Sequence, residues 1–424
     1  MLLSMDINRL KHKLHHNFSR TMTIGKWIVF SIFTGVIMGI ISTLFYHSIA
    51  FVTTLRENNP YFLALLPVGA VIILLFYHFF HYDQDGGTNL VLSAIQSHDH
   101  LPGRMSVLIF FATILSHLAG ASVGREGAAL QIGGSLGGYL GKRLGLSETD
   151  KKTMIMCGMS AAFAGLFGTP MAAAIFSMEV VSVGIMHYAA LLPCVLASYI
   201  AADISLHFGA TPMSFDIAVI PDFDLKGGFY TCLFAIGFGL VSMLFCICLH
   251  RFEEGARLLF PNAYVRAAVC GSILLAATLL AGDQSYNGSG VHTIAACMAG
   301  EHYRWAFFLK ICFTAVSIAA GYKGGEIIPS LSIGASFGSF LASCVHLDPS
   351  LAAAVGMGSV FCGVTNCPIT SLLLCFELFG MEAAPYFLVA ISLSYVVSGY
   401  YSLYRSQKIV YSKFKSNFID KKAD

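Results

Sequence analysis

The chain reads Gly158-Met-Ser-Ala-Ala-Phe-Ala-Gly-Leu-Phe-Gly-Thr-Pro170 and, later, Gly356-Met-Gly-Ser-Val-Phe-Cys-Gly-Val-Thr-Asn-Cys-Pro368. The glycine, methionine, phenylalanine and proline positions that the two stretches share all lie 198 residues apart, the difference between 356 and 158. The same offset carries Glu179 onto Glu377. We therefore interpret the two stretches as equivalent parts of two structural repeats.

A second pair of matching segments and a polar interruption locate the boundary between the repeats. Ile132-Gly-Gly-Ser-Leu-Gly137 matches Ile333-Gly-Ala-Ser-Phe-Gly338 at an offset of 201 residues. The stretch 209–227 breaks the hydrophobic pattern with prolines and aspartates and is the predicted linker. The chain then divides into five regions: a basic N-terminal segment (1–26), a first transmembrane repeat (27–208), the linker (209–227), a second transmembrane repeat (228–404) and a basic tail (405–424).

Composition places these repeats in a bilayer. Of the 424 residues, 56% are hydrophobic and 11% are charged, with a mean hydropathy of +0.72, whereas a soluble chain carries about 25% charged residues. At about 20 apolar residues per crossing there is room for roughly ten spans. A net charge of +2, without basic clusters interleaved with aromatic residues, argues against nucleic acid as a partner. Both ends are basic, so the positive-inside rule predicts that both are cytoplasmic.

Two apolar segments, 128–145 and 330–347, are too short or too rich in glycine for a simple perpendicular span. Each follows a loop that carries an acid, Glu126 in the first half and Glu326 in the second. We therefore expect an all-α polytopic fold with broken and re-entrant helices. Half-helix N-termini supply partial positive charge where two such repeats meet, which predicts an anion as the cargo.

The sharpest motif is Gly124-Arg125-Glu126-Gly127. The flanking glycines let the backbone turn and leave amides open at the start of a helix, where an anion or the Glu126 carboxylate can sit. An ionisable residue at membrane depth predicts a function. The spacing alone leaves an alternative open, in which Arg125 and Glu126 form a structural salt bridge.

A second acidic motif, Gly321-Tyr-Lys-Gly-Gly-Glu-Ile-Ile-Pro329, precedes the equivalent helix of the second half. If the repeats pack about a pseudo-two-fold axis, Glu326 faces Glu126. Two titratable groups on one path predict a proton relay. The alternative is that Lys323 simply pairs with Glu326.

Hydroxyl groups give weaker signals. Gly86-Gly87-Thr88 resembles a helix start with a hydroxyl donor, and Tyr404 ends the last apolar run, where tyrosine is common as an interfacial residue. Ser135 and Ser336 lie in glycine patterns similar to the nucleophile elbow of serine hydrolases. The glycine spacing favours helix packing instead, and an intramembrane hydrolase is kept as the alternative from another class.

Taken together, these motifs resemble the CLC family of anion channels and anion/proton antiporters, over nearly the whole chain from about 27 to 413. The residues that carry the resemblance are Gly124-Arg125-Glu126-Gly127, Gln131-Ile132-Gly133, the segment from Gly325 to Pro329, and the repeats that begin at Gly158 and Gly356. The resemblance implies two inverted helical repeats in a homodimer, with one anion path per subunit. It also implies a gating glutamate at Glu126, an anion-coordinating tyrosine at Tyr404, and anion-facing amides near Glu326 and Ile327.

The chain departs from the common chloride/proton exchangers of that family at three positions. Thr88 or Gly86 stands nearest the place of the usual central serine, and Val180 stands where those exchangers carry an inner proton-transfer glutamate. Glu326 occupies a position that is apolar in those exchangers. All three departures are similar to the fluoride/proton antiporter branch, whereas Ile328 stands where that branch tends to have threonine.

The sequence therefore predicts a CLC-type halide/proton antiporter of a bacterial-type plasma (inner) membrane, exporting fluoride in exchange for proton entry. Glu126 and Glu326 are the predicted gating and proton-transfer residues. The predicted anion-binding residues are Gly86, Thr88, Arg125, Gly127, Ile327 and Tyr404. The expected partners are halide, protons, the lipid bilayer and a second copy of the chain; no cofactor, metal, nucleic acid or enzymatic activity is predicted. A chloride/proton exchanger or a passive chloride channel on the same fold is the alternative.

Overall fold

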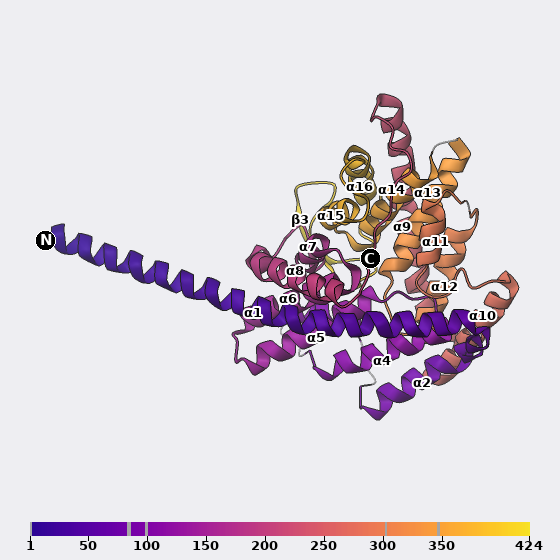
Figure 1. Ribbon diagram of the computed structural model, residues 1–424, viewed down its shortest axis with the longest axis horizontal. Helices are drawn as coiled ribbons and strands as arrows, with labels where there is room; N and C mark the ends of the chain where they lie inside the picture. The colour runs from indigo at the N-terminus through magenta and orange to yellow at the C-terminus, as the bar shows by residue number, and fades with distance from the viewer. Residues whose placement is uncertain (1, 83–85, 98–100, 302, 346–347) are drawn as a thin grey trace.

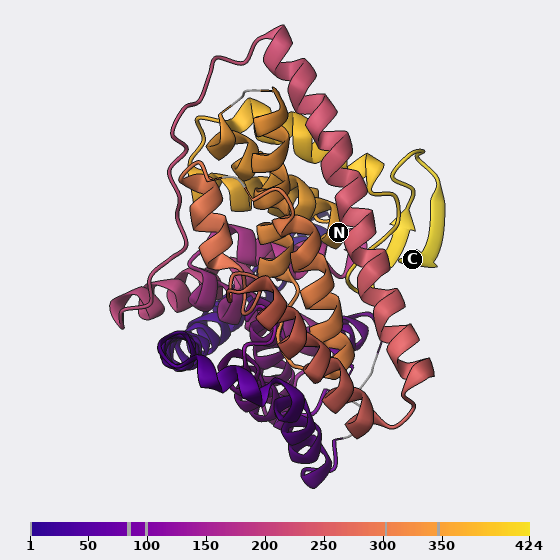
Figure 2. The ribbon, with the colours of Figure 1, turned by 90° about the vertical axis from the view of Figure 1, so that its right-hand side faces the viewer.

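The computed structural model describes residues 2–82, 86–97, 101–301, 303–345 and 348–424, with side chains from residue 21 onward. The two halves of the chain lie side by side, the first in indigo to magenta and the second in orange to yellow (Figures 1 and 2). The helices of the first half are α1 (Leu2–Asn58), η1 (Pro60–Leu65), α2 (Leu66–Phe79), α3 (Thr88–Gln96), α4 (Arg104–Ala119), α5 (Glu126–Arg143), α6 (Glu148–Phe167), α7 (Pro170–Glu179), η2 (Tyr188–Ala190) and α8 (Leu191–His207). Those of the second half are α9 (Leu225–Leu259), α10 (Ala263–Ala281), α11 (Val291–Met298), α12 (Ala306–Ala320), α13 (Ile327–Val345), α14 (Pro349–Thr365), α15 (Pro368–Phe379) and α16 (Ala384–Val397).

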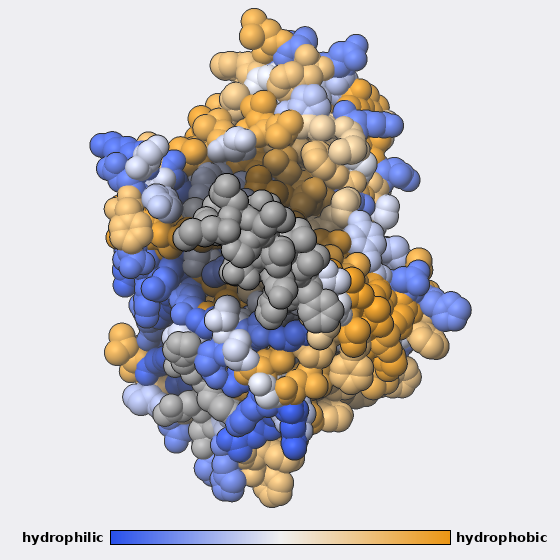
Figure 3. Space-filling model, turned by 90° about the vertical axis from the view of Figure 1, so that its left-hand side faces the viewer, coloured by the Kyte–Doolittle hydropathy of each residue, from blue (hydrophilic) through white to orange (hydrophobic). Residues whose placement is uncertain are grey.

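The protein is a multi-pass membrane protein. Six helical stretches among the described residues are long and apolar enough to cross a membrane alone, fewer than the roughly ten spans for which the sequence has room. The difference arises because other apolar segments are split into short helices, such as α7 with 10 residues and α15 with 12. Large apolar side chains that a soluble protein would bury, such as Ile40 and Leu240, are exposed. Figure 3 shows broad apolar areas of this kind on one face.

The N-terminal basic segment and the first apolar segment form one helix. α1 continues through residues 26 and 27 without a break, and its N-terminal end projects beyond the body of the protein (Figure 1). Residues 209–224 form an irregular connection from α8 to α9. The predicted linker therefore falls largely on irregular backbone, whereas residue 26, the predicted end of the N-terminal segment, lies inside a helix.

A small sheet adds to the all-α architecture expected from the sequence. β1 (Ser182–Val183) follows α7 and pairs in parallel with β2 (Lys408–Tyr411), and β2 pairs antiparallel with β3 (Phe418–Lys422). The hairpin of β2 and β3 lies beside the helical body (Figure 2). The C-terminal tail is therefore joined to the first half of the chain by backbone hydrogen bonds.

Glycine lets equivalent helix pairs of the two halves meet backbone to backbone. A Cβ added to Gly133 of α5 would lie 2.1 Å from the carbonyl oxygen of Gly158 in α6. One added to Gly334 of α13 would lie 2.3 Å from the carbonyl oxygen of Gly356 in α14. Real Cβ atoms do not approach within 3.0 Å. The repeat found in the sequence is thus a repeat of one close helix-packing contact, as small-residue motifs provide in membranes.

The two serines of the hydrolase alternative belong to this packing. The Ser135 hydroxyl donates to the Pro102 carbonyl at 2.7 Å, and the Ser336 hydroxyl donates to the Ser332 carbonyl at 2.7 Å. A nucleophilic serine needs an adjacent general base. Within the described chain both hydroxyls are bonded to backbone carbonyls, so these glycine patterns serve helix packing.

The short helices α7 and α15 cap each other. Glu179, the last residue of α7, accepts hydrogen bonds from the backbone N–H groups of Ile369 at 3.1 Å and Thr370 at 2.8 Å, in the first turn of α15. Glu377, in the last turn of α15, accepts two from the first turn of α7, at 2.8 and 2.9 Å. Each carboxylate satisfies free N–H groups and opposes the positive end of the partner helix dipole. The reciprocal contact explains why the acid is part of the repeat.

We predict that Glu179→Gln lowers the thermal unfolding temperature of the detergent-solubilised protein. The substitution removes the negative charge from the N-terminus of α15, a loss of about 1–2 kcal/mol for a buried site. Glu382→Gln, which changes an exposed carboxylate between α15 and α16, serves as the matched control. Equal unfolding temperatures for the two variants would show that the capping charge does not stabilise the protein.

Candidate functional site

The two glycine-rich motifs meet where the halves join. The Gly124 N–H donates to the Gly325 carbonyl at 2.6 Å, and the Gly325 N–H donates to the Gly124 carbonyl at 2.9 Å. A Cβ on Gly127 would lie 2.8 Å from the Gly325 Cα. The absence of side chains at these glycines therefore brings the starts of α5 and α13 together, as a pseudo-symmetric arrangement requires.

Glu126 is fully buried at the start of α5. Its Oε2 accepts a hydrogen bond from the Arg125 N–H at 3.0 Å, while its Oε1 lies 3.5 Å from the Arg125 Nε. The guanidinium also lies 4.8 Å from the centre of the Tyr46 ring. The salt bridge that the sequence left as an alternative is therefore present, and it holds a carboxylate that water does not reach.

A cavity of about 880 Å³ approaches this junction. Its walls include four of the predicted site residues, Gly86, Thr88, Glu326 and Tyr404, but not Glu126. Basic side chains line it as well, and the exposed ones mark its open side: Arg257, Arg405 and Lys422. The cavity therefore offers basic side chains toward its open side, together with apolar residues and the two acids Glu253 and Glu326.

Thr88 begins α3 after Gly87, whose φ of +58° is in the region that favours glycine. The Thr88 hydroxyl donates to the Gly127 carbonyl at 3.4 Å and accepts a hydrogen bond from the Gln131 Nε2 at 3.3 Å. The Oε1 of Gln131 is buried and has no hydrogen-bond partner among the described residues. Gln131 is a cavity-lining residue that our sequence reasoning did not assign to the site. The sequence feature that could have identified Gln131 is that it is a polar residue among glycines and apolar residues, on the helix that begins at Glu126.

Tyr404 is almost fully buried, with 2% of its surface exposed. Its hydroxyl has no hydrogen-bond partner among the described residues. A buried phenol usually finds a partner, so a donor left free at a cavity wall indicates a place for a ligand.

Glu326 and Ile327 lie at the beginning of α13. Glu326 lines the cavity and accepts the Ser330 N–H at its backbone carbonyl, which starts the helix. Ile327 is fully buried. The Lys323 ammonium, the proposed partner of Glu326 in the alternative interpretation, lies 5.0 Å from the centre of the Tyr77 ring.

Val180 follows α7 and is fully buried. Its carbonyl accepts a hydrogen bond from the Gln407 Nε2 at 2.9 Å. The side chain at this position cannot carry a proton. Among the described residues that line the cavity, the acids are Glu326 and Glu253, and Glu253 is paired with Arg257.

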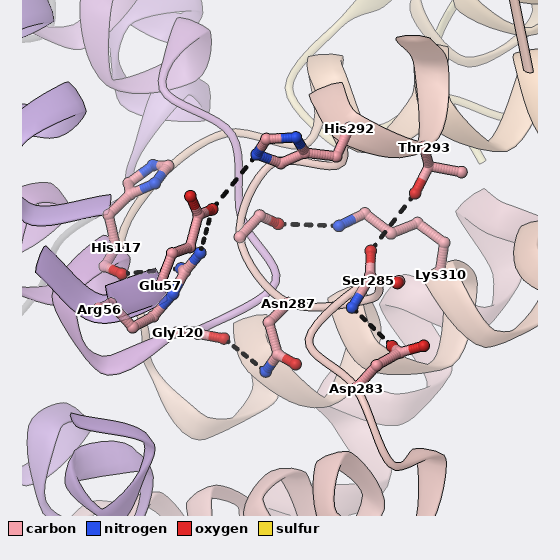
Figure 4. A network of polar contacts seen from close by, with 11 residues as sticks. Arg56, Glu57, His117, Gly120, Asp283, Ser285, Asn287, His292, Thr293 and Lys310 are labelled. Atoms are coloured by element: carbon pink, nitrogen blue, oxygen red, sulfur yellow. Dashed lines mark hydrogen bonds and ion pairs between the residues drawn. The ribbon is translucent and has the colours of Figure 1, made fainter. Parts of the chain in front are cut away.

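The segment that leads into Glu126 is held by a loop of the second half (Figure 4). The Asn287 Nδ2 donates to the Gly120 carbonyl at 2.8 Å, and the Gly288 N–H donates to the Ala121 carbonyl at 3.1 Å. The buried ammonium of Lys310 donates to the carbonyl of Gly288 at 2.8 Å. Sequence reasoning did not find this network, because its members are brought together only when the two halves pack.

Comparison with known proteins supports a family assignment. The sequence profile of a family described as "Voltage gated chloride channel", or Voltage_CLC, matches residues 68–399, most of the chain. The chain belongs to the CLC family. A CLC relative from Pseudomonas syringae pathovar tomato, named "Chloride/fluoride channel protein", is 34% identical over 92% of this chain and 88% of that protein. The "H(+)/Cl(-) exchange transporter ClcA" of Vibrio vulnificus is 23% identical over 81% of this chain and 80% of that protein.

Two solved structures are similar to this CLC chain. One, titled "Crystal structure of a CLC-type fluoride/proton antiporter", is 31% identical, with a TM-score of 0.87 over 90% of this chain and 98% of that one. The other, a "slow cyanobacterial Cl-/H+ antiporter", is 19% identical, with a TM-score of 0.75 over 88% of this chain and 94% of that one. The second similarity shows the fold alone. Both confirm the CLC fold that the sequence predicted.

In this CLC chain the predicted site residues fall into two groups. Gly86, Thr88, Glu326 and Tyr404 line the cavity. The rest lie where α5 and α13 begin: Arg125, Glu126, Gly127 and Ile327. The Thr88 hydroxyl, bonded to the Gly127 carbonyl, joins the two groups.

Proposed function

We propose that this chain is a halide/proton antiporter that exports fluoride in exchange for protons. The observation that carries the proposal is the cavity itself. Its walls include an acid, Glu326, and the Tyr404 hydroxyl, which has no partner among the described residues, and a second, fully buried acid, Glu126, lies at the junction that the cavity approaches. Two buried acids at and near one cavity supply the groups that proton coupling requires. The printed names of the 34% identical relative and the 31% identical structure, which mention fluoride, support the same choice of ion.

Fluoride is small and strongly hydrated, so a binding site has to replace its water with strong donors. Three sources of positive potential converge on the end of the cavity: the Tyr404 hydroxyl and the N-termini of α5 and α13. Thr88 adds a hydroxyl that can turn from the Gly127 carbonyl to an anion. Hydroxyl groups and helix N-termini act on an anion through partial charges, which are weak enough individually to let the anion leave again.

Protons require groups that can change charge. In its ionised form the Glu126 carboxylate occupies the anion path and accepts a hydrogen bond from the Arg125 N–H. When the carboxyl group is protonated, it loses its attraction to the positive N-terminus of α5 and leaves the path. Glu326 takes the role of second proton acceptor, because Val180 cannot. Movement of a halide past Glu126 is thereby tied to movement of a proton.

The same proposal places the protein in the plasma (inner) membrane as a homodimer, with both basic ends in the cytoplasm. The predicted boundaries of the two repeats, 27–208 and 228–404, remain part of it. Residues of one chain line the whole cavity, so the proposed site does not require residues of a second copy.

The test of the proposed function is efflux of fluoride and of chloride from liposomes that contain the purified protein, with external pH recorded. We expect fluoride flux well above chloride flux, accompanied by proton movement in the opposite direction. Faster chloride flux with protons would identify a chloride/proton exchanger, and halide flux without protons would identify a passive channel. Either outcome would overturn the proposal.

We predict that Glu326→Gln reduces proton movement to the level of protein-free liposomes while halide flux continues. Glutamine keeps the size of the side chain but has no exchangeable proton near neutral pH. Glu301→Gln, an exposed carboxylate of the same half, is the control and should transport as the unmodified protein does. If proton coupling persists in Glu326→Gln, this acid is a structural residue.

A further inference from the structure

The backbone of Tyr404 is fixed from both sides. Its N–H donates to the Ser402 Oγ at 3.1 Å, and its carbonyl accepts the Gln407 N–H at 3.0 Å. The phenol hydroxyl at the cavity is the polar group of Tyr404 that has no partner among the described residues. The position of the Tyr404 hydroxyl therefore depends on the contacts that fix Ser402 and Gln407.

The Gln407 side chain is fully buried and uses its whole hydrogen-bonding capacity. Its Nε2 donates to the Val180 carbonyl at 2.9 Å, in the first half of the chain, and to the Thr365 carbonyl at 2.8 Å, in the second. Its Oε1 accepts from the Asn366 Nδ2 and from the Ser402 Oγ, both at 2.9 Å. A buried amide with two donors and two accepted bonds has one orientation, so Gln407 ties Tyr404 to both halves at once.

Lys413 secures this arrangement from the tail. Its three ammonium N–H groups have three acceptors: the Asn366 Oδ1, the Tyr395 carbonyl at 2.9 Å and the Ser398 Oγ at 3.2 Å. The ammonium also lies 4.3 Å from the centre of the Tyr395 ring. Asn366 ends α14 at a φ of +60°, an uncommon value that its amide contacts help to maintain.

The segment after Tyr404 is tied to α3 as well. The N–H and the hydroxyl of Ser406 both donate to the Asn89 Oδ1 at 3.0 Å, and its carbonyl accepts the Gln96 Nε2 at 2.9 Å. Thr88 is the first residue of α3. The same short segment therefore determines the spacing between the Thr88 and Tyr404 hydroxyls that line the cavity.

We propose that a clasp of four residues positions the Tyr404 hydroxyl relative to Thr88 and thereby contributes to halide preference: Asn366, Ser402, Gln407 and Lys413. Fluoride is smaller than chloride, and a small anion gains from donors only when their spacing is held. Members of the clasp do not touch the anion; they are positioning residues. The inference rests on the proposed function, because it assigns the cavity hydroxyls to halide binding.

The test begins with Lys413→Met, which keeps the apolar stem near Tyr395 and removes the three ammonium hydrogen bonds, including the one that holds the Asn366 side chain. We expect the half-saturating fluoride concentration to rise about fivefold, the factor for the loss of one net hydrogen bond at the anion. The fluoride/chloride flux ratio falls accordingly, whereas the maximal rate and the proton coupling stay as in the unmodified protein. Lys415→Met, an exposed lysine of the same tail, is the matched control and changes neither.

A double-mutant comparison separates positioning from general destabilisation. If the clasp acts through the Tyr404 hydroxyl, Lys413→Met has no further effect on the flux ratio in a Tyr404→Phe background. A purely structural loss would add to the effect of Tyr404→Phe instead and would overturn the inference. Ser402→Ala, a smaller change that removes one clasp hydroxyl, keeps the test available if Lys413→Met does not fold. Unchanged flux ratios in folded variants would also overturn it, whereas failure of the proposed function would appear as uncoupled transport by the unmodified protein.

Discussion

Glu126→Gln is expected to abolish proton movement in liposomes while halide efflux continues. The carboxylate is fully buried, is bonded to the Arg125 N–H, and lies at the junction of the two repeats beyond the end of the cavity. Glutamine fills the same space and can accept the same hydrogen bond, but it cannot take up and release a proton near neutral pH. Halide movement and proton movement are then no longer coupled, because the group that takes part in both is lost.

The measurement is simultaneous recording of halide efflux and external pH. Proton flux in Glu126→Gln should fall to the level of protein-free vesicles, with halide efflux still above that background. Glu148→Gln, an exposed carboxylate of α6, should leave both fluxes unchanged. Coupled proton movement in Glu126→Gln would remove Glu126 from the mechanism and leave the ion pair with Arg125 as its role.

Gly133→Ala is expected to prevent formation of a stable, monodisperse protein. The added Cβ would lie 2.1 Å from the Gly158 carbonyl oxygen, and the obstacle is the backbone of α6. Overpacking costs about 1–3 kcal/mol when a neighbouring side chain can move away. The obstacle to this Cβ is backbone, so the clash can be relieved only if the two helices separate. We therefore expect a loss above about 3 kcal/mol.

The same helix supplies the control. A Cβ on Gly138 would lie 3.4 Å from the Ile155 side chain, an ordinary contact, so Gly138→Ala should fold normally. Size-exclusion chromatography and thermal unfolding in detergent distinguish the two variants. Similar profiles for both would mean that α5 and α6 can move apart, contrary to the close contact that the repeat conserves in both halves.

Part of the functional site could be predicted from the sequence alone. Glu126 and Glu326 could be identified because an acid between glycines at the start of an apolar segment is unusual whatever its surroundings. The glycines of the repeat could be identified because equivalent positions matched at one offset. The acids are recognised from their neighbours in the sequence, and the glycines are recognised by comparing two parts of the sequence. Neither observation requires knowledge of the contacts in the folded protein.

Other parts of the site could not be predicted. Gln131 belongs to a motif that is visible in the sequence, but its contact with Thr88 depends on how α5 meets α3. Gln407 and Lys413 lie in the predicted basic tail, and the sequence indicates neither their buried contacts nor the small sheet of that tail. Each of these residues acts through partners that lie far away in the chain.

The sequence by itself determined that the chain spans a membrane as two related helical halves with acids at their glycine-rich junctions. Hydropathy, glycine spacing and internal repetition are properties of the chain, and the bilayer and helix geometry turn them into a fold with few alternatives. Only the tertiary structure decided that Thr88, Glu326 and Tyr404 share one cavity, that α7 and α15 cap each other, and that the tail holds Tyr404 in place. The physical reason is that a hydrogen bond depends on distances of about 3 Å between groups remote in sequence, and such distances exist only after the halves have packed.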